Sequence, residues 1–283
     1  MNYTVPGCIV VFFIVTTLVF IGPLRAQEDI PNTQVQLAIS SPSYPVTSGD
    51  VYSLTYVAAG VPVTYTITVD SSYRIRISNL GIINVTGKTY RQLKQDAETI
   101  VSKNYPLSGV QLTMIKPSVF SVYIKGEVSH SAELTTWAMG RLSSVVSSNL
   151  SAYSSIRNIT VTSADGQIKT YDLFKAQRFG DLREDPYLRP GDIIILKHID
   201  RKISVYGHVE RPGSYELLPD ENIRELIQIY AGGYTSRANI GRVELNRYVE
   251  NNEGVAEIIY LTQDEINDNY PLQHADAVYV PLR

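Results

Sequence analysis

The pattern of apolar and polar positions in residues 205–233 predicts a strand, a tight turn and a helix in one continuous run. Residues 205–209 have the composition of a strand. Pro212 and Gly213 are typical of a turn in which proline sets one backbone angle and glycine takes a neighbouring position with positive φ. A second strand is expected over residues 214–218.

A capped helix should follow this hairpin. Asn222 is a favourable N-cap residue, and Glu225 three positions later can complete a capping box. The apolar positions after the cap share one helical stripe: Ile223, Leu226, Ile227 and Tyr230. A Gly-Gly pair then ends the helix in the left-handed conformation. One helix should therefore lie on a small sheet, and the residues expected to set its shape are Gly207, Pro212, Gly213, Gly232 and Gly233.

Alternating apolar positions in residues 44–117 predict a separate β-rich domain. Its expected strands cover residues 51–56, 64–69, 74–77, 82–85 and 110–115. Thr89 and Gln92 form a second capping box, which starts a helix between the last two strands. The apolar face of that helix consists of Leu93, Ala97, Ile100 and Val101.

The pattern of residues 119–196 returns in residues 203–280. When Gly126 is aligned with Gly207, the apolar positions of two predicted helices also coincide: Leu142, Val145 and Val146 with Ile223, Leu226 and Ile227. Further matches follow in the same order: Ile156, Ile159 and Val161 with Ile240, Val243 and Leu245, Tyr171-Asp172-Leu173 with Tyr260-Leu261, and Pro190-Gly191-Asp192 with His274-Ala275-Asp276. This shared order predicts an internal repeat.

The first copy of the repeat is degenerate. Ser131-Ala132 replaces the Pro-Gly pair, and residues 147–151 replace Ala-Gly-Gly. Three Gly-Asp-like turns each lead into a β-rich run, and together they mark the modules along the chain: Gly49-Asp50, Gly191-Asp192 and Ala275-Asp276.

Residues 1–26 indicate a signal peptide, because an apolar run precedes the helix-breaking pair Gly22-Pro23 and a cleavage site after Ala26. An uncleaved anchor is the alternative, since residues 5–24 are just long enough to span a bilayer. Either reading takes the bulk of the chain out of the cytoplasm. Residues 27–43 are polar and contain two prolines, so a linker is expected there.

Composition and charge narrow the function classes. A chain of 283 residues with 44% hydrophobic and 19% charged residues suits two or three globular domains. A net charge of −3 with no basic run provides no footprint for nucleic acid. The one cysteine, Cys8, lies in the apolar N-terminal run, so no disulfide framework is expected. The 20 tyrosines, against 6 phenylalanines, suit strands or interfaces that favour an aromatic ring with a polar tip.

No catalytic or metal-binding pattern is present in the sequence, so no enzyme activity, cofactor or metal is expected. The histidines lack ligand spacing: His130, His198, His208 and His274. Carboxylates that are neighbours in sequence, such as Glu184-Asp185 and Asp264-Glu265, lie in polar segments. A glycoside hydrolase would need two carboxylates that face each other across a cleft.

Residues 205–233 resemble the soluble-ligand-binding β-grasp module of bacterial polysaccharide export proteins. The matching positions are Gly207, Val209, Pro212-Gly213, Leu226 and Ala231-Gly232-Gly233. Residues 44–117 resemble the export domain of the same family at Gly49-Asp50, Val69-Asp70, Leu80-Gly81 and Gly87-Lys88-Thr89. They depart from it where Ser72-Tyr73 replaces an Asp-Gly turn and Ser78-Asn79 replaces a proline.

The resemblance implies an α+β protein with an export domain over residues 44–117 and two tandem β-grasp modules over residues 118–198 and 203–283. It also implies a homo-oligomeric ring in the periplasm, associated with the outer membrane, that conducts polysaccharide from an inner-membrane copolymerase. Larger members add a C-terminal amphipathic helix that forms an outer-membrane pore. This sequence ends on a predicted strand, so a partner barrel protein is expected.

The alternative from another class is a monomeric periplasmic carbohydrate-binding or scaffold protein. Its ligand surface would lie near the Pro-Gly turn and the Ala-Gly-Gly helix end, where Tyr215, Tyr234 and Arg237 are the candidate ligand-binding residues. The competing interpretation is that these three side chains pack between modules or subunits.

Overall fold

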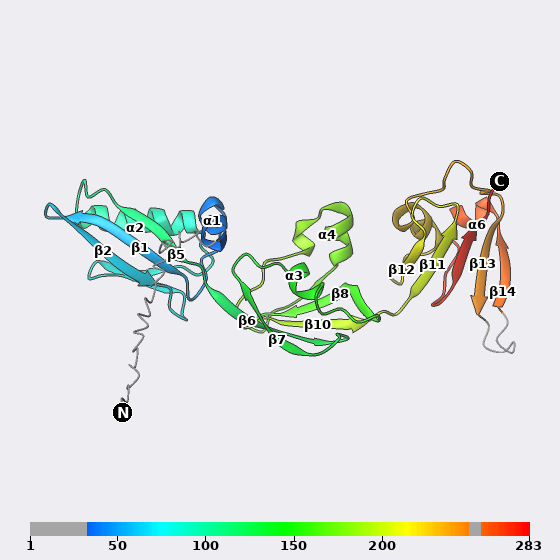
Figure 1. Ribbon diagram of the computed structural model, residues 1–283, viewed down its shortest axis with the longest axis horizontal. Coiled ribbons are helices and arrows are strands. Elements are labelled where there is room, and N and C mark those ends of the chain that lie inside the picture. The colour runs from blue at the N-terminus through cyan, green and yellow to red at the C-terminus, as the bar shows by residue number, and fades with distance from the viewer. Residues whose placement is uncertain (1–32, 249–255) are drawn as a thin grey trace, which may run out of the picture.

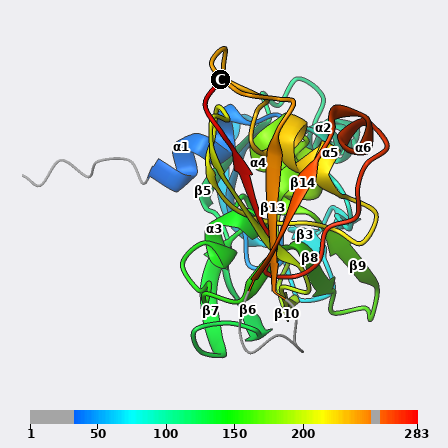
Figure 2. The same cartoon turned by 90° about the vertical axis from the view of Figure 1, so that its right-hand side faces the viewer.

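The chain is described here by a computed structural model that covers residues 33–248 and 256–283, so the expected signal peptide lies outside the described residues. The described chain forms three units that follow one another along the long axis (Figure 1). Seen from the right-hand end, the last unit lies in front of the other two (Figure 2). We call them the N-terminal domain (residues 33–116), the first module (119–198) and the second module (202–283). The expected α+β class is confirmed.

The N-terminal domain combines a three-stranded antiparallel sheet, a hairpin and a long helix. The sheet has the order β2-β1-β5, and the elements are β1 (Val51–Ala58), β2 (Val61–Thr68), β3 (Arg74–Ile77), β4 (Gly81–Asn84), α2 (Tyr90–Asn104) and β5 (Gln111–Lys116). The predicted capping box of α2 is present, with the Thr89 N–H donating to Gln92 Oε1 at 2.9 Å. Leu93, Ala97 and Val101 of α2 are fully buried against the strands.

The expectation of a linker over residues 27–43 is wrong for its C-terminal part. Residues Thr33–Ser40 form the helix α1. Ala38 is fully buried in the core of the N-terminal domain, whereas Leu37 and Ile39 on either side are exposed. A helix of eight residues is marginal alone, so packing on the domain stabilises it rather than its own periodicity.

The two modules have five-stranded sheets with the same topology. In the first, the order is β7-β6-β10-β8-β9, and the elements are β6 (Val119–Gly126), β7 (Ala132–Trp137), α3 (Leu142–Val146), β8 (Ser154–Thr162), β9 (Ile168–Tyr171), α4 (Leu173–Phe179), η1 (Leu182–Glu184) and β10 (Ile193–His198). In the second, the order is β12-β11-β15-β13-β14, and the elements are β11 (Lys202–Gly207), β12 (Gly213–Glu216), α5 (Ile223–Glu225), η2 (Leu226–Tyr230), β13 (Val243–Tyr248), β14 (Ala256–Leu261), α6 (Gln263–Asn267) and β15 (Ala277–Val280). In both, the first strand pairs parallel with the last.

The glycines that end β6 and β11 show why the two copies align. Gly126 and Gly207 have φ values of +93° and +88°. A Cβ on either would overlap the carbonyl oxygen of the last strand, that of Leu196 or of Val280. Both features require glycine, because an L side chain disfavours this backbone conformation and cannot occupy that space.

The three Gly-Asp-like turns also share one structure. Each has a residue with positive φ followed by a buried aspartate: Gly49-Asp50, Gly191-Asp192 and Ala275-Asp276. The carboxylate accepts a hydrogen bond from the N–H three residues earlier, at 2.8, 2.7 and 2.7 Å respectively. The turn therefore closes on its own aspartate before the next strand begins.

Two details predicted from the sequence are wrong, one in the repeat and one in the hairpin turn. Ile159 pairs with Tyr171, and Val243 pairs with Leu261, so Tyr171 corresponds to Leu261 rather than to Tyr260. Strand register, not the matching aromatic ring, sets that equivalence. The positive φ expected at Gly213 in the hairpin turn is not found. Gly213 is instead the first residue of β12, where it pairs with Val205 of β11.

The N-terminal domain is joined to the first module through Asp50. The N–H groups of Thr47 and Ser118 donate to its carboxylate at 2.8 and 2.6 Å, and the hydroxyls of Tyr44 and Tyr52 donate at 2.7 and 3.0 Å. Burial raises the pKa of this carboxyl although all four donors lower it. Because Ser118 immediately precedes β6, the carboxylate fixes the start of the first module against the domain before it.

Candidate functional site

The three candidate ligand-binding residues lie at two places in the second module. Tyr215, on β12, has its ring 5.5 Å from the ring of Tyr230. Its hydroxyl donates to the carbonyl oxygen of Arg211 at 2.8 Å, and burial raises its pKa. Tyr215 is thus engaged within the module, on the side where Tyr230 meets the first module.

Tyr234 and Arg237 belong to the loop that follows the Gly-Gly helix end. Tyr234 forms an isolated bridge with Val209, and its hydroxyl is buried without a hydrogen-bond partner among the described residues. Burial raises the pKa of Tyr234 to about 12. Arg237 is exposed, and its carbonyl oxygen accepts from the Arg283 N–H at 2.8 Å.

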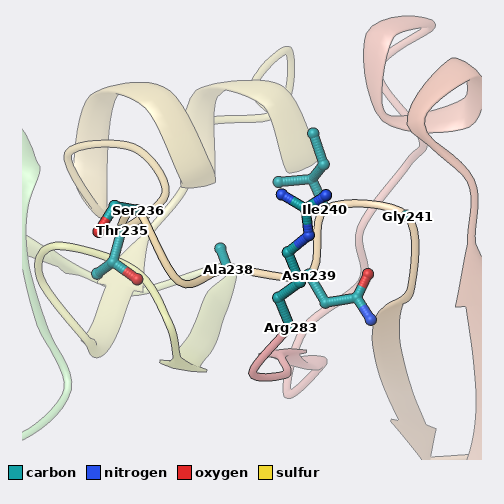
Figure 3. Close-up of a pocket in the computed structure, with 7 residues that line it drawn as sticks. All are labelled: Thr235, Ser236, Ala238, Asn239, Ile240, Gly241 and Arg283. Carbon is teal, nitrogen blue, oxygen red and sulfur yellow. The ribbon is translucent and has the colours of Figure 1, made fainter.

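The same loop lines a surface pocket of about 420 Å³ (Figure 3). Its lining residues are Thr235, Ser236, Ala238, Asn239, Ile240, Gly241 and Arg283. Hydroxyl, amide and guanidinium groups come together there, a set of donors and acceptors that suits a hydroxyl-rich ligand. Tyr234 and Arg237 adjoin the pocket without lining it. The run of small polar residues after Gly-Gly was the available signal for this loop.

A second cluster, which the sequence did not suggest, lies between the two modules. Arg157 of β8 is 5% exposed. Its Nη2 donates to Asp172 at 2.8 Å, its Nη1 donates to Glu221 at 2.9 Å, and Nη1 also contacts the hydroxyl of Tyr230. Burial alone would lower the pKa of this guanidinium, but the hydrogen bonds to Asp172 and the charge of Glu221 raise it. We call Arg157, Asp172, Glu221 and Tyr230 the intermodule cluster.

Aromatic packing closes over the intermodule cluster. The rings of Phe174, on α4, and Tyr230, on η2, stack with centroids 4.8 Å apart. Arg157 lies over the Phe174 ring at 5.0 Å, in the geometry of a cation–π contact. Arg178 donates to the carbonyl oxygens of Ile229 and Tyr230 at 3.1 and 3.3 Å. The end of the second-module helix is thereby held by the first module.

Tyr230 reaches the first module because the second copy has a longer helix end. Asn149 and Gly233 are equivalent, since their carbonyl oxygens accept from Ser129 and Glu210 respectively, each at 3.0 Å. Asn149 lies three residues after Val146, whereas Gly233 lies six residues after Ile227, the equivalent of Val146. The second copy therefore has three additional residues at the end of its helix.

The additional residues lengthen the helical segment, which ends at Tyr230 rather than at the position equivalent to Val146. Its last part, Leu226–Tyr230, is a π-helix where an α-helix was expected. Such turns are rare and often mark functional sites. The expected helix cap is present, with the Asn222 N–H donating to Glu225 at 2.9 Å.

The carboxylates considered as acid or base pairs have structural partners. Asp185 accepts from the N–H and hydroxyl of Ser143 at 2.8 and 2.7 Å, and Glu265 caps α6 through the Thr262 N–H at 2.8 Å. Within residues 33–248 and 256–283, no three His, Cys, Asp or Glu side chains gather as a metal site. No helix in those ranges is long and apolar enough to cross a membrane.

Residues 202–257 match the SLBB domain, a soluble-ligand-binding β-grasp domain found in polysaccharide export proteins. The match covers the intermodule residues Glu221 and Tyr230 and most of the pocket loop. The second module is therefore similar to a domain with a known relation to polysaccharide export, and the first module shares its strand order.

Proposed function

We propose that this chain is a subunit of a secretion system for capsular or extracellular polysaccharide. One observation carries the proposal: the SLBB match lies in the second of two modules with identical strand order. The motifs in residues 44–117 that resemble an export domain precede this pair in the chain. A row of an export-like domain and two β-grasp modules suits a structural part of a secretion channel.

Under this proposal the chain acts without covalent chemistry. Several copies surround a wide, polar path, and the polymer contacts the walls weakly and repeatedly, because tight binding would stop its movement. The intermodule cluster supports such a role, since a wall must keep its modules at a fixed angle. The chain would be exported by its N-terminal segment and would work at the outer membrane with an inner-membrane copolymerase and an outer-membrane barrel.

The solution mass of the full chain tests the oligomer. Native mass spectrometry of protein purified from the envelope should give one closed assembly of many copies. Deletion of the gene should stop polysaccharide from reaching the surface while its synthesis continues. A monomer together with normal surface polysaccharide in the deletion strain would contradict the proposal.

The pocket beside Asn239 and Arg283 favours the alternative, a monomeric carbohydrate-binding or scaffold protein. That function needs a stable complex with a soluble oligosaccharide, whereas a conduit needs only weak contacts. Titration calorimetry distinguishes them: tight binding by a monomer, weakened by Asn239→Ala, would support the alternative.

The need for an outer-membrane barrel partner has its own test. It is contradicted if the purified chain alone conducts dextran through liposomes.

A further inference from the structure

The outer face of the second-module sheet carries a line of tyrosines. Alternate residues of each strand are buried in the core, among them Val205, Leu245 and Val278, and their neighbours point away from it. Strand register places four of these outward residues side by side across the sheet, in the order Tyr206, Tyr279, Glu244, Tyr260. We call these four residues the tyrosine row.

The rings of the row are held in place but remain accessible. Those of Tyr206 and Tyr279 lie 5.1 Å apart, and the side-chain amide of Asn246 donates to the Tyr206 hydroxyl at 3.1 Å. Arg242 lies over the Tyr260 ring at 5.0 Å. Tyr206 is 42% exposed and Tyr260 54%. These contacts reduce the entropy that the side chains would lose on binding a ligand.

The fold does not require this row, because the first module lacks it. The equivalent positions, found by the same register, are Lys125, Ile195, Thr160 and Thr170. None of them is aromatic, and the first-module sheet nevertheless has the same strand order. The β-propensity of tyrosine therefore does not account for three tyrosines among these four positions in only one copy.

We propose that the tyrosine row binds a neutral oligosaccharide segment laid across the strands. Tyrosine offers a rigid apolar face for the C–H side of a sugar ring and a hydroxyl for its polar edge. The Asn246 amide and the Glu244 carboxylate add hydrogen-bonding groups beside the rings. Four strands at about 4.8 Å spacing give a row about 14 Å long, which matches a short oligosaccharide better than a single sugar.

Charge decides in favour of a neutral polymer. Glu244 and Arg242, the charged side chains at the Tyr260 end, lie 3.7 Å apart and balance each other. A uronic acid would have to compete with Glu244 for the guanidinium and would be repelled by the carboxylate. This inference rests on the proposed function. It adds the class of polymer and one surface of the chain that the polymer contacts.

Affinity electrophoresis tests the row with the full chain. Native gels contain either dextran and galactomannan as neutral probes or polygalacturonate as the acidic probe. The neutral gels should retard the wild-type chain. Tyr206→Ala and Tyr260→Ala should each weaken retardation about fivefold, because each removes one ring contact. The matched control is Tyr123→Ala, on β6 of the first module, whose exposure of 42% equals that of Tyr206.

Tyr206→Phe retains the ring and should bind within about twofold of the wild type, with circular dichroism reporting the fold of each variant. The inference is overturned if neither neutral probe retards the wild type, if the alanine variants match Tyr123→Ala, or if polygalacturonate retards the chain as strongly. The solution mass separates it from the proposed function: an assembly whose row variants bind normally refutes only the row, and a monomer that needs the row to bind refutes only the conduit.

Discussion

The first and second modules share one topology but do different work. Each has the obligatory glycine at the end of its first strand and the buried aspartate before its last strand. The second adds three residues at the helix end, an arginine partner for its aspartate and the tyrosine row. The first instead contributes Ala138 to the core of the N-terminal domain and Arg157 to the intermodule cluster. The common fold therefore contacts both neighbouring units in the first copy and exposes a row of aromatic side chains in the second.

The largest effect on stability is expected for Arg157→Ala, which tests the role of the first module in holding the second. The substitution leaves the carboxylates of Asp172 and Glu221 without their buried cation, so it should lower the free energy of unfolding by about 3–5 kcal/mol. Urea unfolding followed by circular dichroism and by the fluorescence of Trp137, the one tryptophan, measures it. The control is Arg183→Ala, which removes an exposed ion pair with Asp181 and should leave the unfolding curve unchanged. Equal curves for both variants would refute the cluster.

The buried aspartates of the two modules should respond differently to loss of charge. In the second module, Arg247 donates to Asp276 from Nε and Nη2 at 3.0 and 2.7 Å. Asp276→Asn loses the charge in this paired contact and should lower the free energy of unfolding by about 2 kcal/mol. Thermal unfolding measures the effect, and an unchanged melting temperature would show that the charged contact with Arg247 does not stabilise the module.

Tyr230→Phe isolates the hydroxyl that the second copy brings to the first module. The stacking on Phe174 remains, while the hydrogen bonds to Glu221 and Arg157 are lost. The free energy of unfolding should fall by about 1 kcal/mol, the typical net value of a buried hydrogen bond. Tyr153→Phe, on an exposed ring of the first module, is the control. A larger decrease in the free energy of unfolding for the control would show that the Tyr230 hydroxyl does not stabilise the intermodule cluster.

The smallest effect should have the opposite sign. Asp192 of the first module has Ser163 in place of Arg247, and its Oδ1 is buried without a partner in the described chain. Burial raises its pKa from the ordinary value of 3.8. The stability that the protonated form contributes is present below that value and is lost as pH rises through the raised pKa.

Asp192→Asn removes this titration and should therefore be more stable than the wild type at neutral pH, by less than about 1 kcal/mol, with a flatter curve of stability against pH. Thermal unfolding between pH 4 and pH 8 provides the measurement. A variant that is less stable at pH 7 would contradict the assignment.

Much of the fold could be predicted because its signals are local. The capping residues Thr89 and Asn222 lie within three positions of their partners, and the Gly-Asp-like turns close on the N–H three residues earlier. The alternation of strand residues identified which positions enter the core. The error at α1 arose where a short, weakly periodic segment depends on the buried contact of Ala38.

The candidate site could be predicted only in part. The loop containing Tyr234 and Arg237 was singled out from its position after Gly-Gly, and other residues of that loop line the pocket. The intermodule cluster could not be found, because Arg157 and Glu221 are 64 residues apart and each looks like an ordinary surface charge in the sequence. The tyrosine row depends on register between strands, which aromatic composition alone does not reveal.

The sequence by itself determined the class of fold, the repeat and the glycines and caps that shape each module, because those features depend on neighbours along the chain. The tertiary structure decided which side chains meet. It wound the longer helix end of the second module as a π-helix, buried Arg157 between two carboxylates and aligned three tyrosines with Glu244 across four strands. The physical reason is that burial, register and charge pairing are properties of contacts between distant segments, and those contacts exist only once the modules pack.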